Sequence, residues 1–319
     1  MSRYQGRTER GVENYVTELT SRLSKLGHKV EVFTSFWQLL NQKRSNLEFS
    51  RSDFTEPVII YPLNGSWQSL GCRIYAWLTG AKLVVGGHAG IGKDDGWNLY
   101  MFPDLFIAFS QKGYDWAKKI NRFVKIVRIS HGVDLDKFNP KVKPLNINLD
   151  RPICITVSHL DRYKRVQDTV RGVAKLTKGS LLILGDGLLE KEVDELGNKL
   201  LGPKRYLRLS VSHQDVPRYL AGADIFTLVS ESSEAFGLVY LEAMACNLPV
   251  VATDDSLRRE IIGAAGIFVK NPEDSQEYAK ALEAAAKIDW RDKPLVQARK
   301  FDWDKIAKVY ENAFDKLIH

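Results

Sequence analysis

Alternating helical and strand-like segments run along the whole chain, and this pattern constrains the fold more than any other feature. In the first half, apolar residues at helical spacing between 12 and 26 end at Gly27, a common helix stop. Further helices are expected near 66–79 and 110–120. Apolar runs predict buried strands at 29–33, 57–61, 82–86, 104–109 and 124–130. Helices that alternate with strands cover parallel sheets, so the sequence predicts an α/β protein.

A second alternating series follows residues 138–152, a polar stretch with three prolines and no periodicity. Such composition is typical of an interdomain linker. Beyond it, strands are expected at 153–157, 180–184, 206–209, 224–228 and 249–253. The helices between and after them are expected at 165–176, 188–200, 215–221, 238–246, 273–287 and 303–317. The sequence therefore predicts two Rossmann-like domains that face a cleft, with ligands bound at the carboxyl ends of the strands.

Composition excludes several classes of protein. The sequence contains no run of 18 apolar residues, so no membrane span is predicted. The N-terminus has no apolar core of the kind that is typical of a secretory signal. The cysteines Cys72, Cys154 and Cys246 lie too far apart for a zinc motif, and their odd number argues against a disulfide framework. We therefore expect a cytoplasmic protein. The Asp94–Asp95 and Asp254–Asp255 pairs are expected to be turn or cap residues in loops, so no metal site is predicted.

The positive charge is confined to the first half of the chain. The net charge is +7, and residues 1–150 hold 21 Lys and Arg against 14 Asp and Glu, whereas the remainder holds 25 of each. This excess predicts either an anionic partner for the first half or a solvated surface. Residues 36–44 combine Phe36, Trp37, Leu39 and Leu40 with two basic residues. They predict either an amphipathic segment in contact with a membrane or a helix or strand packed on the core.

The segment 230–253 carries the densest set of functional residues. A polar loop with Glu234 precedes Gly237, which opens a helix that bears Glu242. Glycine allows close backbone approach to a ligand, and the free N–H groups of a first helical turn bind phosphate. Each carboxylate could accept hydrogen bonds from hydroxyls of a sugar or a ribose. The alternatives are a helix-terminal carboxylate and a surface residue, although Glu242 lies within an apolar run.

The order Glu234-AFGLVYL-Glu242, followed by AMACNLPVVAT, resembles the E-x7-E signature of the group 1 glycosyltransferases (family 4). These retaining enzymes include glycogen synthases and many mannosyl- and glucosyltransferases. The resemblance implies a GT-B fold, with Glu234 facing the donor sugar, Glu242 holding the ribose and the backbone near 237–239 at the diphosphate. Asn247 stands where the family usually has glycine. The donor contacts implied on this segment are Glu234, Phe236, Gly237, Leu238, Val239 and Glu242.

The stretch Ser158-HLDRYKRVQD resembles the family segment in which an arginine and a lysine clamp the diphosphate. Lys164 occupies the lysine position, and its compact charge suits a leaving diphosphate. His159 replaces the arginine, so either Arg162 compensates or phosphate binding is weaker and depends on pH. The alternative for Lys164 is a solvated helix start. LGDG at 184–187 also matches the family order.

In the first half, GGHAGIG at 86–92 resembles the acceptor-side loop of the family, whose histidine contacts the transferred sugar. That role would pass to His88, although a lone histidine after a strand is often structural. Ser130-HGVDLDKFNP resembles the crossover segment, with Gly132 and Asp134 as turn formers, and Phe301-DWDKIAKVY resembles the terminal helix that returns to the first domain. The family's first strand has no counterpart in the polar residues 1–10. Either Gly6 or Gly11 would then represent the loop near the diphosphate, and Gly11 is taken as the donor contact.

These expectations combine into one interpretation. Residues 1–140, with helix 303–319, form an acceptor domain, and residues 151–302 form a nucleotide-sugar domain. Catalysis would involve His88, Lys164 and Glu234, without metal, cofactor or protein nucleophile, and the departing diphosphate would take the acceptor proton. The acceptor would be a glycan or a phosphate-linked lipid on the inner membrane face, and no nucleic acid is involved. A nucleotide-sugar epimerase, a phosphorylase and a non-catalytic nucleotide-sugar binder remain as alternatives on this fold.

Overall fold

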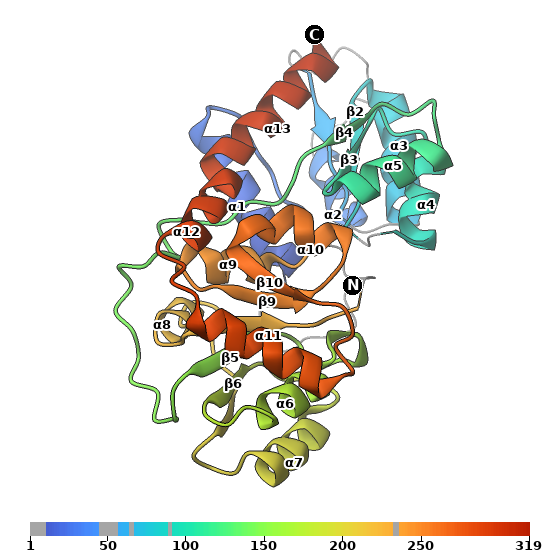
Figure 1. Ribbon diagram of the computed structural model, residues 1–319. Helices are drawn as coiled ribbons and strands as arrows, with labels where there is room; N and C mark the ends of the chain where they lie inside the picture. The colour runs from blue at the N-terminus through green and yellow to red at the C-terminus, as the bar shows by residue number, and fades with distance from the viewer. Residues whose placement is uncertain (1–10, 45–56, 64–66, 89–90, 232–235) are drawn as a thin grey trace. The chain divides into compact units, whose positions relative to one another are not determined.

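The computed structural model describes residues 11–44, 57–63, 67–88, 91–231 and 236–319 (Figure 1). The chain divides into two compact units, one formed by residues 1–131 with 303–319 and the other by residues 132–302. The stretch 138–152 belongs to the second unit because its backbone is bonded to that unit. Leu145 N donates to Arg218 O, and Asp150 N donates to Lys204 O.

The first unit contains a parallel sheet with the strand order β1-β2-β3-β4. Its strands are β1 (Ile59–Ile60), β2 (Lys82–Gly86), β3 (Leu105–Ala108) and β4 (Ile126–Arg128). Leu83, Val84 and Val85 are almost fully buried, as a central strand covered on both faces requires. The helices of this unit are α1 (Gly11–Lys25), α2 (Phe36–Arg44), α3 (Trp67–Thr79), α4 (Lys93–Tyr100), α5 (Gln111–Ile120) and α13 (Trp303–Ile318).

Two sequence predictions for the first unit are wrong. Residues 29–33 form no strand, because Val32 is exposed and no neighbouring strand among the described residues bonds to this segment. The Asp94–Asp95 pair lies in the first turn of α4 rather than in a loop. Acidic side chains are stabilised there by the positive end of the helix dipole. Helix α4 itself was not predicted.

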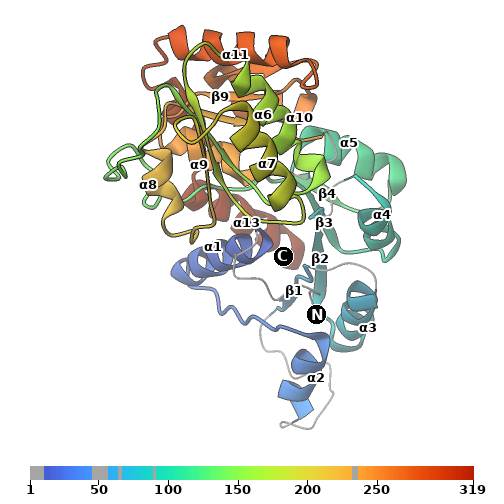
Figure 2. The same cartoon turned by 90° about the horizontal axis from the view of Figure 1, so that it is seen from below.

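The terminal helix α13 packs on α1, as predicted, and the two helices lie side by side in Figures 1 and 2. Buried hydroxyls join them. Tyr15 Oη donates to Tyr310 Oη at 2.9 Å and lies 2.9 Å from Tyr61 Oη. Burial raises the pKa of Tyr15 and that of Tyr310 well above their usual value, so all three groups stay neutral. Helices α1 and α13 are thus fixed to each other and to the segment after β1.

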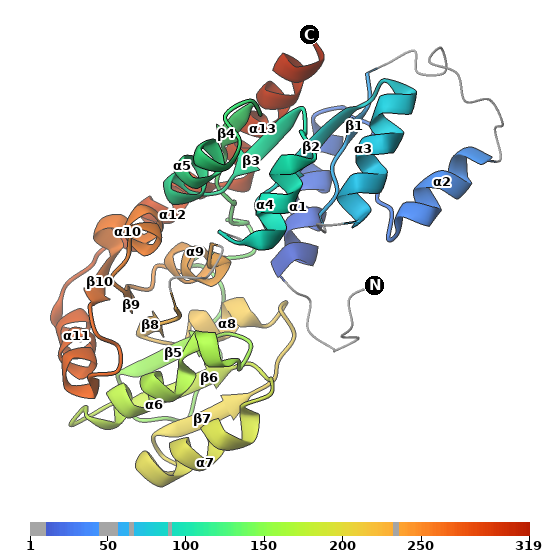
Figure 3. The same cartoon turned by 90° about the vertical axis from the view of Figure 1, so that its right-hand side faces the viewer.

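The second unit is a six-stranded parallel sheet with the order β10-β9-β8-β5-β6-β7. Its strands are β5 (Ile153–Val157), β6 (Ser180–Leu184), β7 (Tyr206–Leu209), β8 (Ile225–Leu228), β9 (Val250–Thr253) and β10 (Gly266–Val269). The helices are α6 (Val166–Ala174), α7 (Glu190–Leu200), α8 (Val216–Leu220), α9 (Leu238–Ala245), α10 (Ser256–Ile262), α11 (Ser275–Lys287) and α12 (Lys293–Ala298). Helices α11, α6 and α7 follow one another across one face (Figures 2 and 3). Strand β10 and helices α10 and α12 were not predicted.

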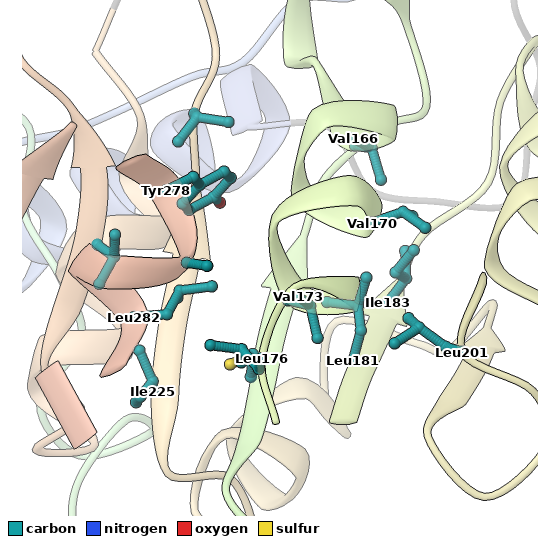
Figure 4. Packing of buried hydrophobic residues seen from close by; sticks show 14 of the residues in the cluster. Val166, Val170, Val173, Leu176, Leu181, Ile183, Leu201, Ile225, Tyr278 and Leu282 are labelled. Carbon is teal, nitrogen blue, oxygen red and sulfur yellow. The ribbon is translucent and has the colours of Figure 1, made fainter. Parts of the chain in front are cut away.

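The core of the second unit lies between this helical layer and the sheet. Figure 4 shows Val166, Val170 and Val173 of α6 directed at strand residues, with Tyr278 and Leu282 of α11 beside them. The Tyr278 hydroxyl is buried but bonded, 2.5 Å from Thr227 Oγ1 and 3.3 Å from Thr169 Oγ1. Because the three hydroxyls bond to one another, Tyr278, Thr227 and Thr169 are buried in this layer without an unpaired hydroxyl among them.

Removing the central hydroxyl of the tyrosine chain tests how α13 is held. In Tyr15→Phe, the hydroxyls of Tyr61 and Tyr310 lose their shared partner, which should cost about 1–3 kcal/mol of local stability. Hydrogen exchange in α1 and α13 should accelerate, while exchange in the second unit stays unchanged. The exposed Tyr100→Phe serves as the control. Equal protection of α13 in Tyr15→Phe and the parent protein would contradict this role.

Candidate functional site

The strand order of the second unit reverses between β5 and β8, which are neighbours in the sheet although strands β6 and β7 lie between them in sequence. In a parallel α/β sheet, the loops at the carboxyl ends of such neighbours separate to opposite faces and leave a binding crevice. Here these loops are residues 158–165 after β5 and, among the described residues, 229–231 and 236–237 after β8. Most of the predicted donor contacts lie on these two loops.

The loop after β5 carries three of the predicted donor contacts, His159, Arg162 and Lys164. His159 is exposed, and its ring nitrogens lie 3.5 Å from Asp186 Oδ1 and 3.8 Å from Asp161 Oδ2. Arg162 and Lys164 lie in a single 3₁₀ turn, Arg162–Lys164. Arg165 follows with φ of 51°, a left-handed conformation that a non-glycine residue seldom adopts outside constrained sites. The loop is therefore a tightly folded, basic segment.

Backbone contacts fix this loop to its neighbours. A Cβ at Gly185, after β6, would clash with the carbonyl oxygen of Ser158, so only glycine lets the two loops approach. On the other side, Glu231 N donates to Tyr163 O at 2.8 Å. The LGDG turn and the loop after β8 thereby hold the Arg162–Lys164 turn from both sides.

The loop after β8 leads into α9 through Gly237, whose φ of 87° requires glycine. Phe236 is buried, while Leu238 and Val239 are half-buried and begin the helix. Tyr240 N donates to Gly237 O at 3.1 Å, whereas Leu238 and Val239 stand at the helix start, where backbone N–H groups are suited to bind an anion. Glu234 lies outside the described residues. The donor contacts implied on 236–239 therefore meet at the start of α9.

Arg258 supports the loop after β8, a role that sequence reasoning missed. Its side chain is fully buried and donates to Ser230 Oγ at 2.6 Å and to Glu231 O at 2.9 Å, and its charge is paired with Asp255. Thr253 Oγ1 adds a bond to Ser230 O at 2.9 Å. Asp255 also caps α10 by accepting from Arg258 N, so the predicted cap role of this aspartate is confirmed. The Asp255–Arg258 spacing at a helix start was the available signal.

Glu242 lies in the second turn of α9 and is buried, with 9% of its surface exposed. Its Oε1 lies 2.9 Å from Nε2 of His213, which sequence reasoning also missed. His213 follows β7 at the carboxyl edge of the sheet. A buried carboxylate with one oxygen bonded retains further lone pairs for a ligand hydroxyl.

Asn247 occupies the position where the resembled family usually has glycine, just beyond the end of α9. Its φ is 65°, in the left-handed region where helices commonly end on glycine or asparagine. The side chain donates to Arg291 O at 2.7 Å and accepts from Leu295 N at 3.3 Å. The replacement therefore preserves the turn and adds two hydrogen bonds to the α12 region.

His88 lies at the end of β2 in the first unit, within a ring cluster. Its ring centroid is 4.8 Å from those of Tyr15 and Phe109 and 6.0 Å from that of His131. Nε2 is buried and has no hydrogen-bond partner among the described residues. Burial lowers the pKa of His88 to about 4, and burial together with His88 lowers the pKa of His131 well below its usual value. Both imidazoles are neutral at pH 7.

The predicted residues divide between the two units. Gly11, the first residue of α1, and His88 belong to the first unit, whereas His159, Arg162, Lys164, Phe236–Val239 and Glu242 belong to the second. Within the described ranges, no cluster of three His, Cys, Asp or Glu residues could hold a metal ion. No helix in those ranges has the length and apolar character to cross a bilayer.

Residues 137–300 match the family model described as "Glycosyl transferases group 1". The chain is 38% identical over 114 residues to an N-acetyl-alpha-D-glucosaminyl L-malate synthase of Bacillus anthracis. The matched stretch covers 35% of the chain and 29% of that relative. It is 28% identical over 249 residues to a D-inositol 3-phosphate glycosyltransferase of Corynebacterium urealyticum, with 69% and 56% covered. The chain thus spans about a third to a half of the length of these relatives.

Solved structures agree over almost the whole chain. Sucrose-phosphate synthase of Thermosynechococcus elongatus superposes with a TM-score of 0.74 at 18% identity, covering 97% of this chain and 94% of its own. The Anabaena protein HepE, solved with UDP and glucose, gives 0.75 at 18% identity, with 98% of both chains covered. These likenesses confirm the predicted GT-B fold.

Acidification tests the burial of the histidine pair. Unfolded histidine takes up a proton near pH 6.5, whereas folded His88 does so only near pH 4. The free energy of unfolding of the first unit should therefore fall between these values, by roughly 3 kcal/mol from His88. Protection of β2 and β3 from hydrogen exchange, corrected for intrinsic rates, measures this loss.

His88→Asn should reduce this pH dependence, and His131 should account for the remainder. The exposed His319→Asn should leave it unchanged. An unaltered pH dependence in His88→Asn would show that His88 is not buried as a neutral group.

Proposed function

The chain belongs to the group 1 glycosyl transferases, whose family model covers more than half of it, and we propose that it transfers a sugar from a nucleotide-sugar donor to a glycan or lipid-linked acceptor. The observation that carries the proposal is the arrangement at the strand-order reversal of the second unit. A basic turn, a helix N-terminus and a buried carboxylate come together there. These groups match a diphosphate and a ribose.

The donor would bind with its diphosphate between Lys164 and the first turn of α9. Lys164 offers a compact positive charge, and the α9 amides at Leu238 and Val239 donate without side-chain rearrangement. His159 and Arg162 lie on the same loop and would contact the diphosphate oxygens. Glu242 would accept from the ribose hydroxyls with the lone pairs that His213 leaves.

For the chemical step, we propose transfer with retention and without a metal, a cofactor or a protein nucleophile. The departing diphosphate oxygen would take the proton of the acceptor hydroxyl while Lys164 and the helix amides stabilise the growing negative charge. His88, neutral because it is buried, would donate or accept a hydrogen bond at the sugar rather than act as a cation. Gly11 would approach the diphosphate from the first unit. Glu234 would face the donor sugar.

A donor panel tests the proposal. UDP-, GDP-, ADP- and dTDP-sugars are compared by calorimetric binding and by slow donor hydrolysis, with Lys164→Ala and Glu242→Ala alongside. One donor should bind, and both variants should weaken its binding at least tenfold, because each removes a charged contact of about 1.5–3 kcal/mol. The exposed Lys178→Ala is the control.

The products distinguish the competing activities. An altered nucleotide sugar released without an acceptor would indicate an epimerase, and binding without any turnover would indicate a non-catalytic binder. If no donor binds at all, the proposed function is wrong.

We also propose that the first unit works at the cytoplasmic face of an anionic membrane, where a lipid-linked acceptor would be found. Helix α3 supports this, since it is apolar on two faces. Tyr75 and Ala76 face the core, whereas Trp67, Trp77 and Leu78 are 84%, 60% and 66% exposed. Helices α2 and α3 contain no acidic residue, and Phe36 of α2 packs against Gly71 of α3. An apolar, acid-free surface suits an anionic bilayer.

Vesicle sedimentation tests the membrane proposal. Binding to vesicles of phosphatidylglycerol and phosphatidylcholine should exceed binding to phosphatidylcholine alone. The double variant Trp67→Ser/Trp77→Ser should bind at least tenfold more weakly, because it removes most of the inserting surface. The control is Trp97→Ser, which removes a similarly exposed tryptophan from α4. Unchanged binding of the double variant would rule out α3 as the contact.

A further inference from the structure

Three side chains from separate segments form one hydrogen-bonded chain in the second unit. Lys137 Nζ lies 2.8 Å from Nδ1 of His213, and Nε2 of His213 lies 2.9 Å from Oε1 of Glu242. Lys137 precedes β5, His213 follows β7, and Glu242 is in α9. Of these three residues, only Glu242 belongs to the E-x7-E signature.

The direction of each bond follows from the chemistry of the groups. A lysine ammonium can only donate, so Nδ1 of His213 must accept and carry no proton. The ring proton then lies on Nε2, where it donates to the Glu242 carboxylate. A doubly protonated ring would place two donors against each other at Nδ1. Lys137 therefore selects one neutral tautomer, and that tautomer directs its N–H at Glu242.

Each member is held in place by its own surroundings. Lys137 lies in a turn in which Asp134 Oδ1 accepts from Asp136 N at 2.9 Å and from Lys137 N at 3.2 Å. This bears out the predicted role of Asp134 as a turn former. His213 lies beside the buried ring of Phe138, at a centroid distance of 5.6 Å, and within the Ser212–Asp215 turn, in which Ser212 Oγ donates to Asp215 Oδ2. Only 18% of the His213 side chain and 11% of the Glu242 side chain are exposed.

We propose that Lys137 and His213 are positioning residues that make Glu242 selective for the ribose of the donor nucleotide. The proposal rests on the proposed function, since it requires a nucleotide at this site. Buried Glu242 has several rotamers, and the Nε2–H bond fixes one oxygen. The other oxygen is then oriented toward a hydroxyl pair. Without this constraint, the carboxylate would be free to turn away from a ligand, and a 2′-hydroxyl would add little.

The consequence is a difference between ribose and 2′-deoxyribose nucleotides. A site built to pair with a hydroxyl rejects an analogue that lacks it, because the buried acceptor is left unpaired. The wild-type protein should therefore bind UDP more tightly than 2′-deoxy-UDP by about tenfold or more, since a hydrogen bond to a charged group contributes about 1.5–3 kcal/mol. Loss of the chain should reduce this ratio without a matching loss of 2′-deoxy-UDP binding.

The experiment measures binding of UDP, GDP and ADP, each with its 2′-deoxy counterpart, to the full chain by calorimetry. His213→Phe keeps the ring contact with Phe138 but removes both nitrogens, and it should bring the ratio close to one. His213→Gln can donate from a similar position and should restore most of the ratio. Lys137→Met should give an intermediate ratio. The control is Lys143→Met, which changes an exposed lysine on the neighbouring segment.

A second measurement separates positioning from general packing. Nitrogen-15 NMR of the histidine rings should show His213 as the neutral Nε2–H tautomer in the wild-type protein and a tautomer mixture in Lys137→Met. Thermal unfolding checks that each variant folds. If His213→Phe does not fold, the Lys137→Met variant keeps the test valid.

The outcomes separate the two proposals. If a nucleotide binds and His213→Phe keeps the ribose-to-deoxyribose ratio of the wild-type protein, the positioning role is wrong and the proposed function stands. Where His213→Phe does not fold, an unchanged ratio in Lys137→Met leads to the same conclusion. If the wild-type protein binds none of the six nucleotides, the proposed function fails and this inference fails with it. A ratio that falls in His213→Phe and recovers in His213→Gln supports both.

Discussion

The reversal of strand order between β5 and β8 is the constraint on which the candidate site depends. Chains that leave two neighbouring parallel strands toward opposite faces cannot fill the space between their first turns, so a crevice forms without help from side chains. The sequence places its basic turn after one strand and its helix N-terminus after the other. Topology brings these two groups to the same edge, and local backbone geometry then sets their spacing.

That spacing is maintained by residues with little conformational choice. Gly185 permits the approach of Ser158, and Gly237 adopts a conformation closed to most side chains. Arg258 ties the loop before α9 to α10 through Ser230 and Asp255. A buried arginine is costly unless its donors are used. The Arg258 bonds to Ser230 Oγ and Glu231 O use two of these donors, and they fix the position of the loop after β8.

Sequence reasoning succeeded where a local pattern determines the structure. Every strand expected beyond residue 152 is present, because continuous apolar runs between turns have few other uses in a parallel sheet. The family and its fold followed from the segment around Glu242 and are confirmed by the comparisons. The strand at 29–33 was wrong because an apolar alternation forms a strand only where a partner strand is available. That partner is a tertiary fact, absent from the local pattern.

Residues that act through contacts distant in sequence were also beyond prediction. His213 and Lys137 lie 76 positions apart, and His213 and Glu242 lie 29 apart, so no spacing rule brings them together. Arg258 stands in the segment SLRREII, whose local pattern does not indicate that this one arginine is fully buried. Asn247 was a departure from the expected glycine, yet asparagine is the other residue that tolerates a left-handed helix end, and its amide bonds to the backbone at Arg291 and Leu295.

The buried groups nearest the candidate site residues differ between the two units. In the second unit, Arg258 is buried in an ion pair with Asp255, and Glu242 is buried with a hydrogen bond to His213. In the first unit, tyrosine hydroxyls and two imidazoles are buried as neutral groups, and burial shifts their pKa values away from the charged forms. A negatively charged diphosphate is stabilised by fixed positive charges, whereas a sugar hydroxyl needs only neutral hydrogen-bonding groups. The basic turn of the second unit therefore suits the diphosphate that we propose there, and the neutral His88 of the first unit suits the proposed contact with the sugar.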